Sequence, residues 1–175
     1  MSPKSPKPRK ASTQRPRRPA VHSLDSIFRP RSVAVVGASR RPNQIGHQIV
    51  RNLVEGGFTG PVYPVNPSAP VVHSMHCFPK VSAIPGPVDL ALIVVPAPLV
   101  LQAAKDCGAK GVKGIVCITA GFAEIGGEGT KRQEDLMAVC RKYGMRLVGP
   151  NCMGVLNTQE EFQMNASFAE VQPVP

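Results

Sequence analysis

Three side chains in one short loop have the chemistry to bind phosphate. Ser39, Arg40 and Arg41 lie between an apolar, β-branched run at 33–36 and a helical pattern that begins near Ile45. A hydroxyl can hydrogen-bond a phosphate oxygen, and guanidinium groups carry a permanent positive charge. The helix start behind the loop adds free backbone N–H groups and the positive end of the helix dipole. The sequence therefore predicts a site for the phosphates of a nucleotide or dinucleotide.

The elements that must position this loop alternate between strand and helix. Short apolar runs predict strands at 32–37, 62–65, 89–95, 114–119 and 146–148. Helical spacing predicts helices at 45–55, 99–107 and 130–143, with a short helical lead-in at 24–28. Residues 67–87 are expected to be irregular, with one turn near 81–84. This order predicts an α/β fold, a Rossmann-like doubly wound parallel sheet of about five strands in a single domain.

Each predicted strand ends in a loop that is marked by glycine, proline or asparagine. These loops are 37–46, 66–67, 96–98, 119–123 and 149–154. The carboxyl ends of parallel strands lie at one edge of the sheet, and ligands bind there. We therefore expect one ligand to contact all five loops.

The positive charge is concentrated in the first twenty residues. They hold seven of the lysines and arginines and no acid, so the net charge of +10 falls to +3 for residues 21–175. We expect 1–22 to be a disordered, basic, proline-rich tail, 23–157 to be the folded domain, and 158–175 to be an extension or linker towards a missing second domain. A solvated tail without a specific partner is favoured over a nucleic-acid-binding tail on a folded scaffold.

Other classes of protein are disfavoured by composition. The longest apolar stretch, 90–101, is too short to span a membrane and contains two prolines. The five cysteines form no CxxC pair and predict reduced, packed thiols in a cytoplasmic protein. His73, His76 and Cys77 lack a second pair of ligands, so no metal site is expected.

The glycine spacing argues against a nicotinamide dinucleotide. Such a site shows GxGxxG, with an acid at the end of the second strand for the ribose. Here Gly37 and Gly46 are nine residues apart, and the second strand ends in Asn66. The Tyr-x-x-x-Lys pair of short-chain dehydrogenases is also missing. An NAD(P)-binding redox sensor or oxidoreductase is therefore kept only as the less favoured, alternative interpretation.

Five motifs, in order, resemble one known family. They are VVGAS (35–39) with Ile45-Gly46, PVYPVNP (61–67), GPVDLALIVVPAP (86–98), ITAGFAE (118–124) and LVGPNCMG (147–154). Together they resemble the N-terminal CoA-binding domain of NDP-forming acyl-CoA synthetases, the group of ADP-forming acetyl-CoA synthetases and fused protein acetyltransferases. The domain is similar to that of the succinyl-CoA synthetase alpha subunit. The resemblance covers residues 27–168.

The resemblance implies that the ligand is coenzyme A or an acyl-CoA, and it implies no catalytic residue in this chain. The phosphates of the 3′-phospho-ADP part would be held by Gly37, Ala38, Ser39, Arg40, Ile45 and Gly46. Val65, Asn66 and Pro67 would border the nucleotide, and Val95, Pro96 and Ala97 would lie along the adenosine or pantetheine. Thr119, Ala120 and Gly121 would contact the pantetheine arm, with Asn151 near the thiol end.

Several of these positions also have a purely structural interpretation. Gly37 and Gly46 suit tight packing of strand against helix, and Arg41 suits a solvated loop. Glu124 is commonplace near a helix start, and Cys152 is favoured as a packed thiol over a nucleophile.

The resemblance also implies that the chain lacks the reacting parts of the family. The family converts an acid, CoA and a nucleoside triphosphate into acyl-CoA, nucleoside diphosphate and phosphate. It does so through a histidine in a second domain and an ATP-grasp domain. His22, His47, His73 and His76 match no phosphohistidine motif. We expect this chain to be the CoA-binding module of such a ligase, with the remaining synthetase domains or an ATP-grasp subunit as partners, and not to complete ligation alone.

Overall fold

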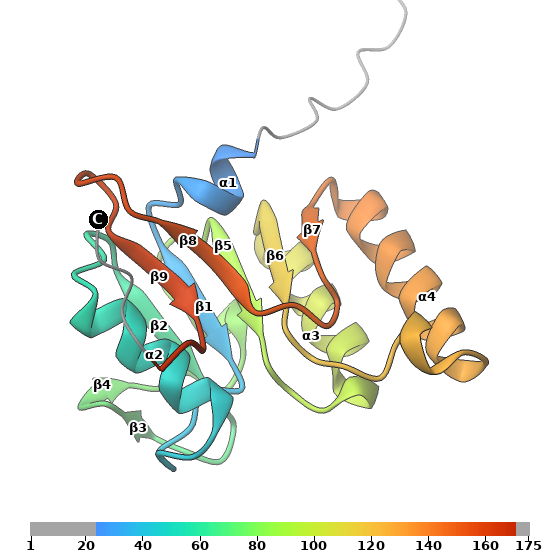
Figure 1. Ribbon diagram of the computed structural model, residues 1–175, viewed down its shortest axis with the longest axis horizontal. Helices are drawn as coiled ribbons and strands as arrows, with labels where there is room; N and C mark the ends of the chain where they lie inside the picture. Colours follow the sequence, from blue (N-terminus) through green and yellow to red (C-terminus); the bar gives the residue numbers. More distant parts are fainter. Residues whose placement is uncertain (1–23, 171–175) are drawn as a thin grey trace, which may run out of the picture.

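The computed structural model describes residues 24–170, so the predicted basic tail lies outside the described residues. Five parallel strands form the main sheet: β1 (Val33–Val36), β2 (Val62–Val65), β5 (Leu90–Ile93), β6 (Gly114–Cys117) and β7 (Arg146–Val148). Their order is β2-β1-β5-β6-β7 (Figure 1). The predicted doubly wound sheet is confirmed. The chain reverses direction across the sheet between β1 and β5, which makes this the switch point at which such folds bind ligands.

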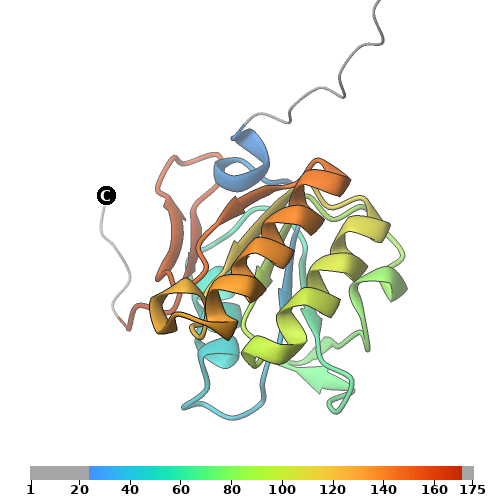
Figure 2. The ribbon, with the colours of Figure 1, turned by 90° about the vertical axis from the view of Figure 1, so that its right-hand side faces the viewer.

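Helices cover both faces of the sheet. Helix α2 (Ile45–Glu55) packs on one face, whereas α3 (Ala97–Lys110) and α4 (Glu128–Tyr143) lie side by side on the other (Figures 1 and 2). Alternate residues of β1 supply the two cores: Val33 and Val35 belong to the cluster that contains α2, and Ala34 and Val36 to the cluster that contains α3 and α4. Because both faces are buried, the central strands are continuously apolar rather than alternating.

The helix bounds differ slightly from those predicted. Helix α3 begins at Ala97 and α4 at Glu128, each two residues earlier than predicted. Pro98 fits the first turn of α3 because a backbone N–H there needs no partner within the helix. Short elements complete the chain: α1 (Asp25–Phe28), and the 3₁₀ turns η1 (Val81–Ala83) and η2 (Ala123–Ile125). None of the helices in residues 24–170 is long and apolar enough to cross a membrane.

Two antiparallel hairpins were not predicted. One is β3 (Val71–Val72) with β4 (Met75–His76), inside the segment expected to be irregular. The other is β8 (Gly154–Asn157) with β9 (Met164–Ser167), and β9 is buried against α2. The predicted domain ends at residue 157, the last residue of β8, whereas in the structure β9 pairs with β8 and the folded part continues through β9.

The second hairpin is anchored to α2 by one buried side chain. The amide nitrogen of Asn52 donates to the carbonyl oxygens of Ser167 at 2.9 Å and Ala169 at 2.8 Å. Asn52 is 1% exposed, so these hydrogen bonds form away from water. The helix that follows the phosphate-binding candidate is therefore fixed from both sides, by the sheet and by the hairpin.

Candidate functional site

We call the loop between β1 and α2, residues 37–44, the phosphate loop. Gly37 adopts φ +97°, and its N–H donates to the carbonyl of Val65 at 2.9 Å. A Cβ placed on Gly46 would lie 2.0 Å from the carbonyl oxygen of Gly37. The first turn of α2 therefore packs directly on the loop backbone, which only glycine allows. Tight packing and ligand binding are compatible here, since this packing is what brings the helix start to the loop.

The amino end of α2 is open to an anion. Gln44 precedes the helix in an extended conformation and makes no capping hydrogen bond with its side chain, and the first turn contains no acid. The hydroxyl oxygen of Ser39 accepts a hydrogen bond from the N–H of Arg41 at 3.0 Å, which shapes the loop. Arg40 and Arg41 are exposed, and neither forms an ion pair within residues 24–170. Their charge is available to a ligand.

A first cavity of about 340 Å³ lies beside the phosphate loop. It is lined by Ser39, Arg40, Arg41, Gln44, Asn66, Ser68 and Ala69. Asn66 holds the two sides together, because its amide nitrogen donates to the carbonyl of Ala38 at 2.8 Å while its oxygen accepts from the N–H of Ser68 at 2.8 Å. The lining is polar and basic, and contains no acid.

A second cavity of about 510 Å³ adjoins the first at Gln44, which lines both. Its other lining residues are Ile45, Val94, Val95, Pro96, Ile118, Thr119, Ala120, Asn151, Cys152, Met153 and Phe168. Ile45 is 43% exposed and Met153 59%, so apolar side chains are presented to a ligand. This lining suits an aliphatic chain with a few polar groups.

Hydrogen bonds tie together the loops that surround the second cavity. The hydroxyl of Thr119, after β6, donates to the carbonyl of Val95, after β5, at 2.7 Å. The N–H of Asn151, after β7, donates to the carbonyl of Thr119 at 3.1 Å. Three of the loops expected to share one ligand are thus bonded in series across the carboxyl edge of the sheet.

The predicted site residues divide into two groups. Those that line a cavity are Ser39, Arg40, Ile45, Asn66, Val95, Pro96, Thr119, Ala120 and Asn151. Those that line neither cavity are Gly37, Ala38, Gly46, Val65, Pro67, Ala97 and Gly121. Val65 is 2% exposed and its side chain belongs to the core.

Sequence reasoning did not select several lining residues. Arg41 is one of them: the sequence favours neither a ligand contact nor a solvated charge for this residue, and in the structure it lines the first cavity. Gln44, Ser68 and Ala69 also line it, and Phe168 reaches the second cavity from the end of β9. The signal for Phe168 would have been recognition of 164–167 as a buried strand.

The thiols near the site are poor nucleophiles. Burial raises the pKa of Cys117 to about 12, and burial also raises the pKa of Cys152. The sulfur of Cys152 lies 3.4 Å from the carbonyl oxygen of Cys117, as a weak donor. All five cysteines are free, as expected for reduced thiols. Within the described part of the chain, no three His, Cys, Asp or Glu side chains gather in a way that would hold a metal.

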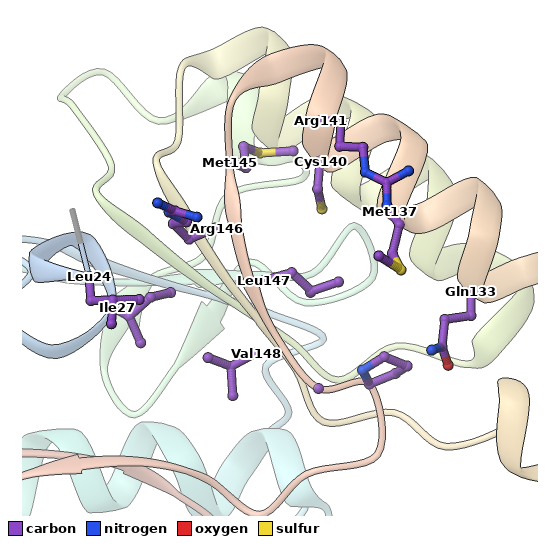
Figure 3. A pocket seen from close by; sticks show the side chains of 12 residues that line it. Leu24, Ile27, Gln133, Met137, Cys140, Arg141, Met145, Arg146, Leu147 and Val148 are labelled. Atoms are coloured by element: carbon purple, nitrogen blue, oxygen red, sulfur yellow. The ribbon is translucent and has the colours of Figure 1, made fainter. Parts of the chain in front are cut away.

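A third cavity, of about 340 Å³, lies away from the phosphate loop, beside β7 at the edge of the sheet (Figure 3). Side chains of α1, α4 and β7 line it, among them Met137, Cys140 and Leu147. None of the predicted site residues lines this cavity. Of the three cavities, only the first two are lined by predicted site residues.

Comparison with known proteins identifies the family of the chain. The family described as the CoA binding domain matches residues 31–158. The alpha subunit of the ADP-forming acetate–CoA ligase II of Pyrococcus furiosus is 47% identical over 148 residues, covering 85% of this chain and 32% of that protein. The ADP-forming acetate–CoA ligase I of Archaeoglobus fulgidus is also 47% identical, over 86% of this chain and 21% of that protein.

A solved structure has the same fold. The dinucleotide-forming acetyl-coenzyme A synthetase 1 of Ca. Korarchaeum cryptofilum, in complex with phosphate and ADP, superposes with a TM-score of 0.82 at 45% identity, over 87% of this chain and 32% of that one. The chain thus spans about a fifth to a third of the length of these relatives. Its match to the family over most of its length, together with the two adjoining cavities at the switch point, shows that the chain belongs to the CoA binding domain family and is homologous to the alpha subunits of ADP-forming acetyl-CoA synthetases.

Proposed function

We propose that this chain binds coenzyme A or an acyl-CoA across the first and second cavities. The observation that carries the proposal is the pairing of a basic, polar cavity with a larger apolar one, joined at the start of α2. Coenzyme A has the same division, with a highly charged nucleotide at one end and an uncharged pantetheine arm at the other.

The phosphates would lie at the phosphate loop. Arg40 and Arg41 supply positive charge and form no ion pair with an acid in the part of the chain that the structure describes, and the uncapped amino end of α2 adds backbone donors. Such a helix end contributes about 0.3–1 kcal/mol per interaction with an anion, and charge-assisted hydrogen bonds to arginine contribute more.

The pantetheine arm would lie in the second cavity. Ile45 and Met153 offer apolar contact, whereas the backbone at Thr119, Ala120 and Asn151 offers polar groups to its amides. In this orientation the thiol end points towards Asn151, away from the phosphate loop.

We further propose that the chain acts as the CoA-binding module of an ADP-forming acyl-CoA synthetase and works in the cytoplasm. Relatives are named acetate–CoA ligase and 4-hydroxybutyrate–CoA ligase, and this chain matches only a part of each. The remaining synthetase domains, or a separate ATP-grasp subunit, would supply the nucleotide and the phosphate-transfer histidine. No residue of this chain is assigned a catalytic step.

Calorimetric titration of the full chain with CoA, dephospho-CoA and NADH tests the binding. CoA is expected to bind more tightly than dephospho-CoA, and NADH is expected not to bind. An Arg40→Ala, Arg41→Ala double variant should narrow the difference between the first two ligands, whereas Arg141→Ala, on α4 at the third cavity, should leave it unchanged. Absence of CoA binding would overturn the proposal, and equal binding of CoA and dephospho-CoA would remove the role of the 3′-phosphate.

A further inference from the structure

The loop after β6, residues 119–124, is held at its two ends by different means. Thr119 is bonded to the loop after β5 through its hydroxyl, and Phe122 is 1% exposed in the core beneath α3 and α4. Between these anchors lie Ala120 and Gly121. Ala120 is exposed and lines the second cavity.

The peptide between Ala120 and Gly121 has little restraint of its own. Gly121 adopts φ +100°, and glycine populates many other backbone conformations at similar free energy. In a trans peptide the carbonyl and the N–H point in opposite directions, so the direction of the Gly121 N–H also sets that of the Ala120 carbonyl. A flip of this one peptide would exchange an acceptor for a donor beside the second cavity.

Two side chains fix Gly121 from outside the loop backbone. The carboxylate of Glu124 accepts the N–H of Gly121 at 2.5 Å, and the guanidinium of Arg132, on α4, donates to the carbonyl of Gly121 at 3.0 Å. Both polar atoms of the flexible residue are therefore bonded to charged groups, and such bonds are stronger than bonds between neutral groups.

We infer that Glu124 and Arg132 are positioning residues for the ligand: they hold Gly121 so that the Ala120 carbonyl oxygen keeps one direction, as an acceptor for the pantetheine arm. Neither side chain lines the first or second cavity. Glu124, which the sequence marks only as an acid near a helix start, thereby acts on binding through the loop. This inference rests on the proposed CoA site.

The test compares CoA with its nucleotide half, adenosine 3′-phosphate 5′-diphosphate, as ligands of the full chain. The nucleotide half would bind in the first cavity, which Ala120 does not line, so its binding should not depend on Ala120. Glu124→Ala is expected to weaken CoA binding about tenfold, a change in the range for loss of a charge-assisted hydrogen bond, and to leave binding of the nucleotide half unchanged. Glu124→Gln keeps an acceptor oxygen and should restore most of the affinity.

Glu128→Ala is the matched control. Its side chain is 88% exposed and its carboxylate lies 3.8 Å from Arg132, whereas the side-chain partners of Gly121 are Glu124 and Arg132. It should leave both affinities unchanged, whereas Arg132→Ala should reproduce the selective loss for CoA.

The outcomes separate a failure of the proposed function from a failure of this inference alone. Wild-type protein that binds neither ligand would overturn the proposed function, and this inference with it. Wild-type binding with unaltered CoA affinity in Glu124→Ala would overturn the inference alone. An equal loss for both ligands would also overturn it, because that result would indicate general loss of structure.

Discussion

The side chain of Asn66 donates a hydrogen bond of 2.8 Å to the backbone carbonyl of Ala38, and so joins the end of β2 to the phosphate loop. Its side-chain oxygen accepts a hydrogen bond from the N–H of Ser68, so both polar atoms of the side chain bond to the protein itself. At the corresponding strand end, NAD-binding folds place an acid that binds the ribose. Here the residue instead supports the loop, which agrees with the absence of the dinucleotide glycine pattern.

Asn66→Asp should harm the site rather than create an NAD site. A carboxylate cannot donate to Ala38, and it would place negative charge beside the first cavity. Urea unfolding is expected to show a loss of about 1–3 kcal/mol, and calorimetry a loss of CoA affinity of about tenfold or more, without NADH binding. Asn43→Asp adds the same charge to the exposed part of the loop and should leave the free energy of unfolding unchanged. NADH binding by Asn66→Asp would contradict this account of the strand end.

Gly46→Ala should prevent α2 from packing on the phosphate loop. The new Cβ would meet the Gly37 carbonyl oxygen at 2.0 Å, and backbone cannot rotate away as a side chain does. We expect the free energy of unfolding to fall by about 1–3 kcal/mol and CoA binding to be lost. Gly86→Ala is a suitable control, since its Cβ would meet only the Tyr63 hydroxyl, at 3.2 Å. Unaltered stability of Gly46→Ala would show that the loop and helix are less closely packed than described.

His73 should make the protein less stable in mild acid. Its ring lies 4.2 Å from that of His47, and its pKa is lowered from 6.5, first by burial and then by the charge of His47. A backbone hydrogen bond at His47 and the charge of Glu55 oppose this shift by smaller amounts, and Arg51 lowers the pKa slightly further. Between pH 6.5 and the lower pKa of His73 in the folded state, the unfolded chain binds a proton at His73 more readily than the folded chain does. The free energy of unfolding therefore falls as the pH falls through this range.

Urea unfolding at pH 7.5 and pH 5.5 measures this effect. The loss of stability between the two conditions should be smaller in His73→Gln than in the wild type. His76→Gln, at an exposed position in the same hairpin, should behave as the wild type. An identical pH dependence in His73→Gln and wild type would exclude His73 as its origin.

Removal of residues 158–175 should destabilise the domain. Met164 and Ala166 of β9 are 1% and 0% exposed, and both belong to the core cluster that contains α2. Without them, Ile49 and Leu53 on α2 lose part of their cover, and Asn52 loses two acceptors. A chain that ends at 157 is expected to melt at a lower temperature than the full chain by circular dichroism. Equal melting temperatures would support the boundary at 157 that the sequence suggests.

The main sheet could be predicted because its strands are buried on both faces. Runs such as 90–93 and 114–117 are continuously apolar, so their type can be predicted, whereas these strands end at Ile93 and Cys117, two residues before the predicted ends at 95 and 119. The glycines and prolines that follow the strands also predict the loops expected to contact a ligand. The contacts of the phosphate loop and of the loop after β6 could therefore be proposed from the sequence.

The hairpins could not be predicted, because their signals are weak or contrary. The first turns at His73 and Ser74, both with positive φ, a conformation usually marked by glycine or asparagine. In β9, Asn165 and Ser167 are 3% and 4% exposed, and the Ser167 hydroxyl donates to the Asn165 oxygen at 2.6 Å. Buried polar residues that satisfy each other look like a loop in sequence. Phe168 reaches the second cavity only through such long-range packing.

The hydrogen bonds between Asn52 and the end of β9 also affect the order in which the domain can assemble during synthesis. The bonded residues are 115 and 117 positions apart, so α2 lacks this support until the last of them has been made. At roughly 5–20 residues per second, that interval is about 6–23 s. During it, the apolar side of α2 that faces the hairpin is uncovered, and the nascent chain carries a phosphate loop whose helix is not yet held in place. In the growing polypeptide, the phosphate loop therefore depends on a segment that is translated more than a hundred residues later.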